Sequence, residues 1–596
     1  MAAALAFVME SGLAAAAQAP GPALPETPAA DEPTRLSEDE ALERALAHPK
    51  VAAWLDRYPP GPTTDVELRP ESRTWVVKAW SGEAGQIAQV VVEDTTGRVA
   101  EAWTGPQVAW RMARGGEGAF GGKILLEPYV WVALCLVFLL GLADLRRPFS
   151  VRNLDLVVLL SFSISLYVFN RGEIFASVPL VYPVLLYLLV RGLRIALRGR
   201  GEPLRPVWPT WALAAAAVFL LGFRIGLDVE RSGGVIDVGL AGVVGASRIL
   251  DGEAPYGNMP RRGNLEPCGP EDTDGQVRER IQTNGRCEAA VERGDTYGPV
   301  SYLAYVPATS IFDWTGRWDS LPAARATSIA FDLVVVLGLA LVGLRLGGLR
   351  LGAALAFGWV AFPFTAYTLN ANTNDAIMPA FLVLGFLLLT SDWMRGGAVA
   401  LAGWTKFAAL LLAPLWASYP TLELRRALRF AVAFLAVTLA AFGLLLLEPS
   451  LVDAVRTFWE RTLGFQLGRD SPFSLWGWGQ YHAVGIPDLG FVQPILAVAT
   501  AALALLVAFV PRRKGPVELA ALTAAVLVAF QLSLTHWFYL YIPWVLPFVL
   551  LWLLVPGTEE RSGTGQESGT RTASMDEALP VSGSHSTSAP SMRTPP

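Results

Sequence analysis

The pattern of hydrophobic and polar positions separates a short N-terminal region from a long apolar one. Within residues 36–112 the pattern first repeats as in an amphipathic helix, EALERALAHPKVAAWLDRY, and then alternates in TWVVKAW, QIAQVVVED and RVAEAW. The preceding SEDE, which starts at Ser37, is a capping box, and alternation with period two is typical of half-buried strands. This region is therefore predicted to be a small α+β domain, with one helix followed by an antiparallel sheet.

Apolar runs long enough to cross a bilayer follow from Leu125 onward. The predicted spans are 126–144, 153–170, 174–192, 208–226, 323–344, 351–369, 376–391, 427–447, 491–510, 517–535 and 537–555. Arg-rich loops alternate with poorly charged ones and are expected to be cytoplasmic, which places the N-terminal domain outside. Segment 396–418 fits only as a short hairpin that bends near Gly403–Lys406, because a single crossing would leave Arg512 and Arg513 outside.

The predicted fold is thus a polytopic α-helical membrane protein of about eleven full spans plus a short helical hairpin, with a small extracytoplasmic α+β domain. Residues 1–19 are a candidate signal peptide, although they lack a basic n-region, and 20–35 are a Pro/Ala-rich linker. Residues 126–192 hold three additional spans, and 208–555 hold the rest of the membrane core. Residues 556–596, rich in Ser, Gly and Thr, are predicted to be a disordered cytoplasmic tail.

Composition agrees with a membrane protein, since 53% of the 596 residues are hydrophobic and only 17% are charged. The net charge of −5, without a basic stretch that alternates with aromatics, gives no indication of a nucleic-acid partner. Cys268 and Cys287 flank one predicted external loop. They could pair, closing about twenty residues for roughly 3 kcal/mol, or remain as two free thiols.

Candidate chemistry gathers in the loops predicted to share the external side. Asp237 lies in a Gly/Ala-rich segment at a membrane exit, the hairpin brings Lys406 towards that side, and the loop 458–482 adds Arg469. Acids, arginines and tryptophans beside a membrane suit a substrate with a charged head and a hydrophobic tail, such as a polyprenyl-phosphate sugar. Cations can stabilise a leaving phosphate, and a carboxylate can take the proton of an acceptor hydroxyl. This chemistry requires neither a metal nor another cofactor.

Each candidate also has a structural interpretation. Asp237 could cap a helix, with Asp228 and Asp251 as rival bases; Lys406 could snorkel, and Arg469 could form a surface pair with Asp470. Asn374 and Asp375 are first of all caps of the next span, His482 and His536 interfacial residues, and the external Trp and Tyr belt aromatics. The remaining substrate-loop candidates are Arg248, Asp251, Tyr256, Tyr297, Asn374, Asp375, Asp470 and Trp476.

Residues 208–555 resemble the GT-C superfamily of polyprenyl-phosphate-sugar-dependent glycosyltransferases, most closely glycosyltransferase family 87 of actinobacteria. The matching stretches are IDVGLAGVVGASRILDGEAPYG, GDTYGPVSYLAYVP, NTNDAIMPAFLVLGFLLL, GWTKFAALLLAPL, GRDSPFSLWG and HWFYLYIPWVLP. The resemblance implies that Asp237, the aspartate of the first external loop, is the catalytic base. The chain departs from better-known members in its three additional spans, its N-terminal domain and a Cys-containing insertion at 258–294.

The N-terminal domain resembles a PepSY domain in its ending, VVVEDTTGRVAEAW, which implies a binding or regulatory module with an extracytoplasmic partner. For the whole chain we expect an inverting glycosyltransferase of the bacterial cell membrane. It would move a mannose- or arabinose-like sugar from a polyprenyl-phosphate donor to an envelope glycan or glycolipid acceptor. One alternative is a lipid-linked sugar transporter, which would place ionisable residues at the bilayer midplane. Another is a non-catalytic envelope sensor or assembly protein.

Overall fold

The computed structural model describes residues 34–116, 124–199, 202–232, 234–271, 277–318 and 321–556. They form two compact units. The first ends at Arg111 and also contains Gln480–Ile486, and the second contains all other described residues from Met112 onward. The candidate signal peptide, nearly all of the linker and the tail beyond Pro556 lie outside the described residues.

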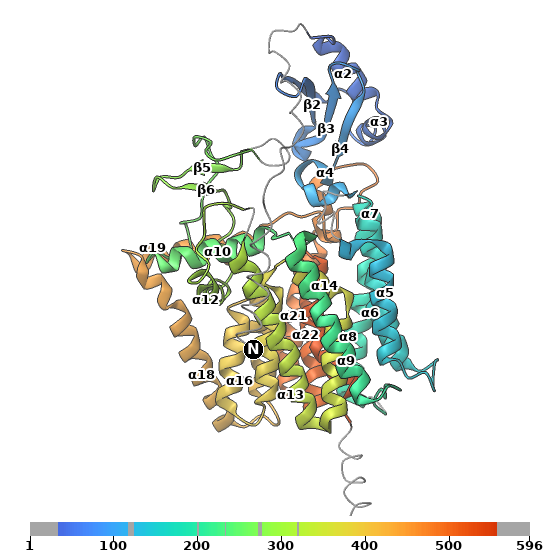
Figure 1. Cartoon of the computed structure of the whole chain (residues 1–596), viewed down its shortest axis with the longest axis vertical. Coiled ribbons are helices and arrows are strands. Elements are labelled where there is room, and N and C mark those ends of the chain that lie inside the picture. Colours follow the sequence, from blue (N-terminus) through green and yellow to red (C-terminus); the bar gives the residue numbers. More distant parts are fainter. Residues whose placement is uncertain are drawn as a thin grey trace, which may run out of the picture. The chain divides into compact units, whose positions relative to one another are not determined.

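The described part of the N-terminal unit has three α-helices and a four-stranded antiparallel sheet of order β1-β2-β3-β4 (Figure 1). Its elements are α2 (Glu38–Ala47), α3 (Pro49–Leu55), β1 (Thr63–Arg69), β2 (Thr74–Trp80), β3 (Gln86–Glu93), β4 (Val99–Thr104) and α4 (Pro106–Ala109). The capping box is present, because Glu40 N–H donates to Ser37 Oγ at 3.3 Å and Ser37 N–H donates to the Glu40 carboxylate at 2.9 Å. The buried face of α2, Ala41 and Ala45, packs on β2 and β3.

Two predictions for this unit need correction. The single predicted helix is two helices, because His48 precedes Pro49 and adopts an extended conformation (φ −61°, ψ 126°). The sheet also has an additional strand, β1, whose residues are only partly buried or exposed throughout. Such an edge strand lacks the strong hydrophobic alternation from which strands are recognised.

Segment Gln480–Ile486 belongs to the N-terminal unit although it comes late in the chain. Tyr481 packs edge-on against Trp54 at a ring-centroid distance of 6.4 Å, and Val484 N–H donates to Arg57 O at 3.0 Å. His482, expected at the membrane interface, instead lies 3.9 Å from the Glu83 carboxylate. The segment therefore completes the surface of this small domain.

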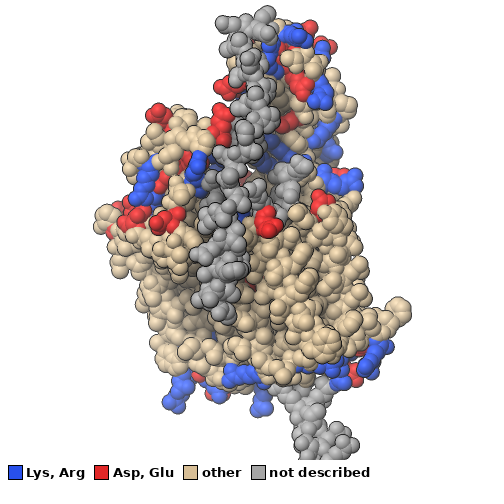
Figure 2. Space-filling view, viewed as in Figure 1, with Lys and Arg blue, Asp and Glu red and all other residues tan. Residues whose placement is uncertain are grey.

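The second unit is a polytopic helical membrane protein (Figure 1). Its longer helices are α5 (Pro128–Leu142), α6 (Val151–Phe169), α8 (Val181–Arg198), α9 (Thr210–Leu227), α10 (Asp237–Leu250), α13 (Pro322–Ala361), α14 (Pro363–Asn370), α15 (Ile377–Leu387), α16 (Asp392–Gly403), α18 (Leu424–Phe442), α19 (Leu451–Trp459), α21 (Val492–Phe509), α22 (Pro516–Ser533) and α23 (Leu546–Leu554). Figure 2 shows that charged side chains are sparse over a broad band of its visible face, with Lys and Arg gathered at its lower end.

The count of eleven full spans is not reproduced. Among the described residues, seven helices are long and apolar enough to cross a membrane, and Pro128–Leu142, Asn374–Leu387 and Phe407–Ala417 are shorter apolar helices. The predicted span 537–555 consists of a 3-10 helix (Tyr539–Trp544) and the nine-residue α23, because Pro543 and Pro547 interrupt regular helical hydrogen bonding.

Two predicted reversals of the chain are present. The 40-residue α13 is folded back on itself at Gly347 and Gly348, whose backbone is not helical. Consistent with this, a Cβ on Gly343 would lie within contact distance of Gly352, whereas nine residues of straight helix span about 13 Å. The second reversal lies between α16, which ends at Gly403, and the 3-10 helix η8 (Phe407–Leu412), which packs back on α16.

An ion pair ties three helices together inside the apolar core. Arg224 of α9 donates to Asp332 of α13 at 2.8 Å, and the side chains are 1% and 3% exposed. Trp359 Nε1 donates to the same carboxylate oxygen at 2.8 Å, and Arg224 also donates to Thr365 O at 3.0 Å. An uncompensated charge here would be costly, so this network fixes the packing of α9 against both arms of α13.

The Cys-containing insertion carries a short hairpin, β5 (Glu279–Ile281) and β6 (Cys287–Ala289). Cys268 and Cys287 form a disulfide with a Cα–Cα distance of 5.9 Å. Glu288 of β6 forms a buried ion pair with Arg248 of α10, which also donates to Asn258 O at 2.9 Å. The disulfide therefore crosslinks the insertion internally, and the Arg248–Glu288 pair holds it against the helix that begins at Asp237.

Replacing Asp332 with alanine should lower the free energy of unfolding by about 3–5 kcal/mol, because Arg224 would stay buried without its partner. The matched control is Glu460→Ala, which breaks the exposed pair with Arg456 and should cost about 1 kcal/mol or less. Thermal unfolding of the two purified variants in detergent compares them. Equal stability of both variants would contradict the role given to the Arg224–Asp332 pair.

Candidate active site

Six segments that are far apart in the sequence meet around Lys406. They are the start of α10, the loop before α11 (Pro299–Leu303), the 3-10 turn η7 (Asn374–Ala376), the bend after α16, the segment after α20 (Phe465–Leu467), and the stretch from His536 through η12 (Tyr539–Trp544). The site is thus assembled from loop and helix-end residues on a rigid helical support.

Lys406 is held by a buried ion pair. Its Nζ lies 3.1 Å from Asp375 Oδ1, and the two side chains are only 8% and 2% exposed. Trp544 Nε1 donates to the same oxygen at 2.9 Å. The bend after α16, the turn η7 and the 3-10 helix η12 are therefore joined at a single carboxylate.

Aromatic rings surround the Lys406 ammonium. Its Nζ lies 4.5 Å from the Tyr297 ring centroid, 5.7 Å from that of Trp544 and 5.9 Å from that of Tyr541. Tyr541 and Trp544 stack on each other at 4.4 Å. Cation–π contacts of this kind hold a charged group in an environment with little water.

The loop that carries Tyr297 approaches the bend closely because its next residue is glycine. A Cβ on Gly298 would clash with the Trp404 carbonyl, and Val300 N–H donates to that carbonyl at 3.1 Å. Behind the ring, Tyr256 Oη donates to Tyr297 O at 3.0 Å. Tyr256, a predicted substrate contact, is 4% exposed and thus supports Tyr297 from the protein side.

Asp237 is the first residue of α10, and its Oδ1 accepts a 3.0 Å hydrogen bond from Val238 N–H. The helix lies tightly on the α14–η7 loop, since Ile236 N–H donates to Ala371 O and a Cβ on Gly239 would meet the Asn372 carbonyl. The side chain is open to solvent, yet the protein around it is dense. A carboxylate that faces a recess, rather than a convex surface, is both open to solvent and surrounded by dense protein.

The electrostatic environment of Asp237 includes both predicted cations. Burial raises the pKa of the Asp237 carboxyl above its usual value, while Arg469 and Lys406 oppose part of this rise. A charge lowers the pKa of a nearby acid only over short distances, because water and salt screen it further away. The structure therefore brings Asp237, Lys406 and Arg469 into one site.

A histidine belongs to the same site. His536 Nδ1 shares a 2.9 Å hydrogen bond with Ser471 Oγ, two residues after Arg469. Burial, together with Arg469 and Lys406, keeps the pKa of His536 well below its usual value, so the ring is neutral at pH 7. The sequence predicted an interfacial residue at this position and gave no indication of the contact with Ser471.

The other predicted substrate residues have structural partners. Arg248 pairs with Glu288, and Asp251 forms a 2.8 Å pair with Arg286, so both fasten the insertion. Asn374 donates to Ser301 Oγ at 2.7 Å, and Trp476 donates to Leu532 O at 2.8 Å. The rival base Asp228 is buried and accepts a 2.7 Å hydrogen bond from Asn372.

Four members of the site were not among the predicted site residues: Ser471, His536, Tyr541 and Trp544. The last three lie in HWFYLYIPW, where Trp and Tyr at a span end are typical of interfacial anchors. Sugar stacking was only a secondary possibility for the two aromatics. The signal that could have distinguished them is the break at Pro543, which marks this stretch as irregular backbone rather than a regular span. Asp470 is exposed beside Arg469. Within the described part of the chain, no group of three or more His, Cys, Asp or Glu side chains is arranged to hold a metal ion.

Residues 296–566 match the model of glycosyltransferase family 87. This range includes Tyr297, Asp375, Lys406, Arg469 and His536, and it begins 59 residues after Asp237. Comparison with curated proteins and with solved structures gives no significant match. The family match supports a membrane-embedded glycosyltransferase.

Replacing the carboxylates of Asp375 and Asp237 with neutral amides should have different effects on protein stability. Asp375→Asn leaves Lys406 buried without its counter-ion and should cost about 3 kcal/mol or more of stability. Asp237→Asn should not lower stability at pH 7. The raised pKa of Asp237 means that ionisation costs the folded state free energy as pH rises through that pKa, and the amide removes this cost.

Thermal unfolding in detergent at pH 7 tests this contrast. Because wild-type Asp237 becomes protonated as pH falls, the stability difference between wild type and Asp237→Asn should also narrow at acidic pH. A destabilised Asp237→Asn protein at pH 7, comparable to Asp375→Asn, would show that Asp237 is a structural residue.

Proposed function

We propose that the membrane unit is an inverting glycosyltransferase that uses a polyprenyl-phosphate sugar as its donor. The observation that supports this most directly is the arrangement of Asp237, Lys406 and Arg469, an accessible carboxylate beside two cations. The reaction needs one group to accept a proton and others to hold a phosphate, and this site offers both. The family match supports glycosyl transfer independently of that geometry.

Asp237 is suited to act as the general base. It is solvent-accessible, and its Oδ1 accepts a hydrogen bond from Val238 N–H in its own helix turn, so the other oxygen can face a substrate. The raised pKa makes its carboxylate a stronger proton acceptor than that of an ordinary aspartate. Asp375 is less suited, since Lys406 and Trp544 already occupy it.

Lys406 and Arg469 are suited to hold the donor phosphate. An ammonium has three N–H donors, and the contact with Asp375 uses one of them. The planar guanidinium of Arg469 matches two phosphate oxygens at once. Because Lys406 is held by an ion pair and three rings before substrate binds, little reorganisation is needed when the charge on the leaving group develops.

In the proposed step, the acceptor hydroxyl oxygen attacks C1 of the donor sugar from the face opposite the phosphate. The new C1–O bond forms as the bond between C1 and the phosphate oxygen breaks, and the bonding pair leaves with the polyprenyl phosphate. The hydroxyl proton passes to the Asp237 carboxylate. Displacement from the opposite face inverts the anomeric configuration.

The surface beside this site suits a lipid-linked donor. Helix α19 leads into the segment that carries Arg469, and it exposes Leu451, Val452, Val455 and Trp459. We propose that the sugar is mannose- or arabinose-like and that the acceptor is an envelope glycan or glycolipid outside a bacterial cell membrane. On this orientation the N-terminal unit is extracytoplasmic, the tail is cytoplasmic, and the N-terminal unit is a PepSY-like module that binds an envelope partner.

The first test is sugar transfer from radiolabelled polyprenyl-phosphate donors to envelope extracts by membranes that contain each variant. Asp237→Asn should lower the transfer rate about 10²- to 10⁴-fold, because the acceptor loses its base. The matched control is Asp251→Asn, which changes an aspartate of the same region that pairs with Arg286, and it should retain transfer. Full transfer by correctly inserted Asp237→Asn protein would reject Asp237 as the base.

A second test uses the pH dependence of transfer. Arg469 lowers the pKa of Asp237, so Arg469→Gln should raise that pKa further and move the acidic limb of kcat/KM to higher pH. Arg293→Gln is the matched control. Arg293 lies over the same Phe465 ring, 5.2 Å from its centroid against 5.8 Å for Arg469, but it is not among the charges that shift Asp237. Identical pH profiles for the two variants would contradict the proposed site.

A further inference from the structure

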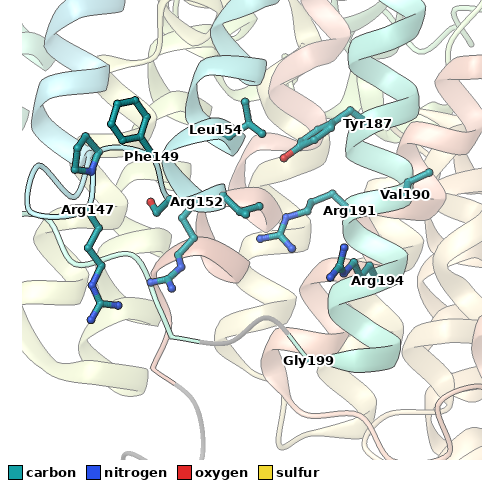
Figure 3. A pocket seen from close by; sticks show the side chains of 12 residues that line it. Arg147, Phe149, Arg152, Leu154, Tyr187, Val190, Arg191, Arg194 and Gly199 are labelled. Atoms are coloured by element: carbon teal, nitrogen blue, oxygen red, sulfur yellow. The ribbon is translucent and has the colours of Figure 1, made fainter.

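A basic cavity lies between the N-terminal end of α6 and the C-terminal end of α8 (Figure 3). Its volume is about 870 Å³, within the range of about 300–1,000 Å³ that is usual for small-molecule sites. It is far from the proposed active site. Tyr182, near the opposite end of α8, accepts the backbone N–H of Leu475 from the segment that follows Ser471. Arg191 and Arg194 lie nine and twelve residues further along this helix, which corresponds to about 13 and 18 Å.

Four arginines line this cavity, and none of the lining residues is acidic: Arg147, Arg152, Arg191 and Arg194. Arg191 pairs with Asp155 at 2.9 Å, and Arg147 pairs with Glu202 in an exposed contact. Arg194 is exposed, and within the described part of the chain it has no carboxylate partner. The cavity therefore carries an excess of positive charge.

The basic wall is held in place before any ligand binds. Asn153 is 7% exposed, and its Nδ2 donates to the carbonyls of Asp144, Arg147 and Pro148 at 3.0–3.1 Å. Its Oδ1 accepts the N–H of Asp144 at 2.9 Å. Asp155 similarly fixes Arg191, with Tyr187 donating to its Oδ1 at 2.6 Å. Guanidinium groups on such a fixed frame lose little entropy when they bind an anion.

The cavity is also apolar on one side. Phe149, Val151, Leu154 and Val190 line it, and between 48% and 102% of each residue's surface is exposed. Three of these residues, Val151, Leu154 and Val190, lie on the long apolar helices α6 and α8, where a membrane would cover them. An anion bound here would thus have arginines on one side and hydrocarbon on the other, which suits a phospholipid better than a soluble phosphate.

We propose that this cavity binds the phosphate headgroup of an anionic phospholipid, with the acyl chains along Leu154 and Val190. Arginine matches a phosphate with paired N–H donors, and anionic lipids accumulate opposite basic loops on the cytoplasmic side. Inorganic phosphate and glycerol phosphate share the headgroup chemistry but lack the chains. The three additional helices then form a lipid-anchored module, independent of glycosyl transfer.

The test measures the thermal stability of the purified full-length protein in detergent with added phosphatidylglycerol, phosphatidylcholine or glycerol phosphate. Phosphatidylglycerol should stabilise the wild type at lower concentrations than the other two. Each arginine near a lipid phosphate contributes roughly fivefold to the affinity. The apparent affinity of the Arg152→Ala/Arg194→Ala protein for phosphatidylglycerol should therefore be about 30-fold lower than that of the wild type. Arg425→Ala/Arg512→Ala removes two exposed arginines from loops also predicted to be cytoplasmic, and it should bind as the wild type does.

Equal losses in both double variants would overturn the proposal, because surface charge alone would then explain the effect. Equal stabilisation by glycerol phosphate would overturn the lipid assignment in favour of a soluble phosphate. Arg194→Glu provides a variant that breaks no described ion pair, and its loss of phosphatidylglycerol binding should exceed that of Arg425→Glu. Sugar transfer serves as an independent readout, since failure of the glycosyltransferase proposal would leave these lipid affinities unchanged.

Discussion

The buried ion pair between Asp375 and Lys406 is the constraint on which the candidate site depends. A buried lysine without a partner is costly because its charge is removed from water, and Asp375 is the partner of Lys406. Because Asp375 also accepts from Trp544, the pair fixes three loops relative to one another. The hairpin after α16 therefore cannot move away from η7 and η12 without leaving two charges uncompensated.

The same site gives two carboxylates different chemistry through their surroundings. Asp375 is 1% exposed, and its carboxylate is occupied by the Lys406 ammonium and the Trp544 indole N–H, so it has a structural role. The Asp237 side chain reaches solvent, but the surrounding protein is dense. The effect of this burial on the pKa of its carboxyl exceeds the opposing effect of Arg469 and Lys406, so the pKa is raised. Pairs of acids whose environments separate their roles are a recurrent feature of catalytic sites. In the proposed mechanism, Asp375 positions Lys406 for the donor phosphate, and Asp237 is left to accept the proton.

Much of this arrangement could be predicted from sequence, and the limits have physical causes. The convergence of Asp237, Lys406 and Arg469 followed from orienting the spans by their arginines and bending segment 396–418 at Gly403–Lys406. The partners of Arg248 and Asp251 could not be predicted, because they lie in an insertion whose hairpin and disulfide set their positions. The capping box at Ser37 could be recognised from four consecutive residues. The end of the first helix at His48 could not, because its signal is a single following proline within an otherwise regular helical pattern.

The family match and the geometry contribute different parts of the argument. The match begins at residue 296, so it covers Lys406 and Arg469 but neither Asp237 nor α10. What joins Asp237 to the matched region is close packing at glycines. Gly239 of α10 lies against the Asn372 carbonyl, and Gly298 lies against the bend that carries Lys406. A side chain at either glycine would push its segment away from these carbonyls and separate the proposed base from the proposed phosphate site. The Asp375–Lys406 pair holds the matched part of the site together, whereas the link from Asp237 to that part rests on these backbone contacts at glycines. Topology could predict that the segments lie on one side, but only the three-dimensional structure shows where they touch.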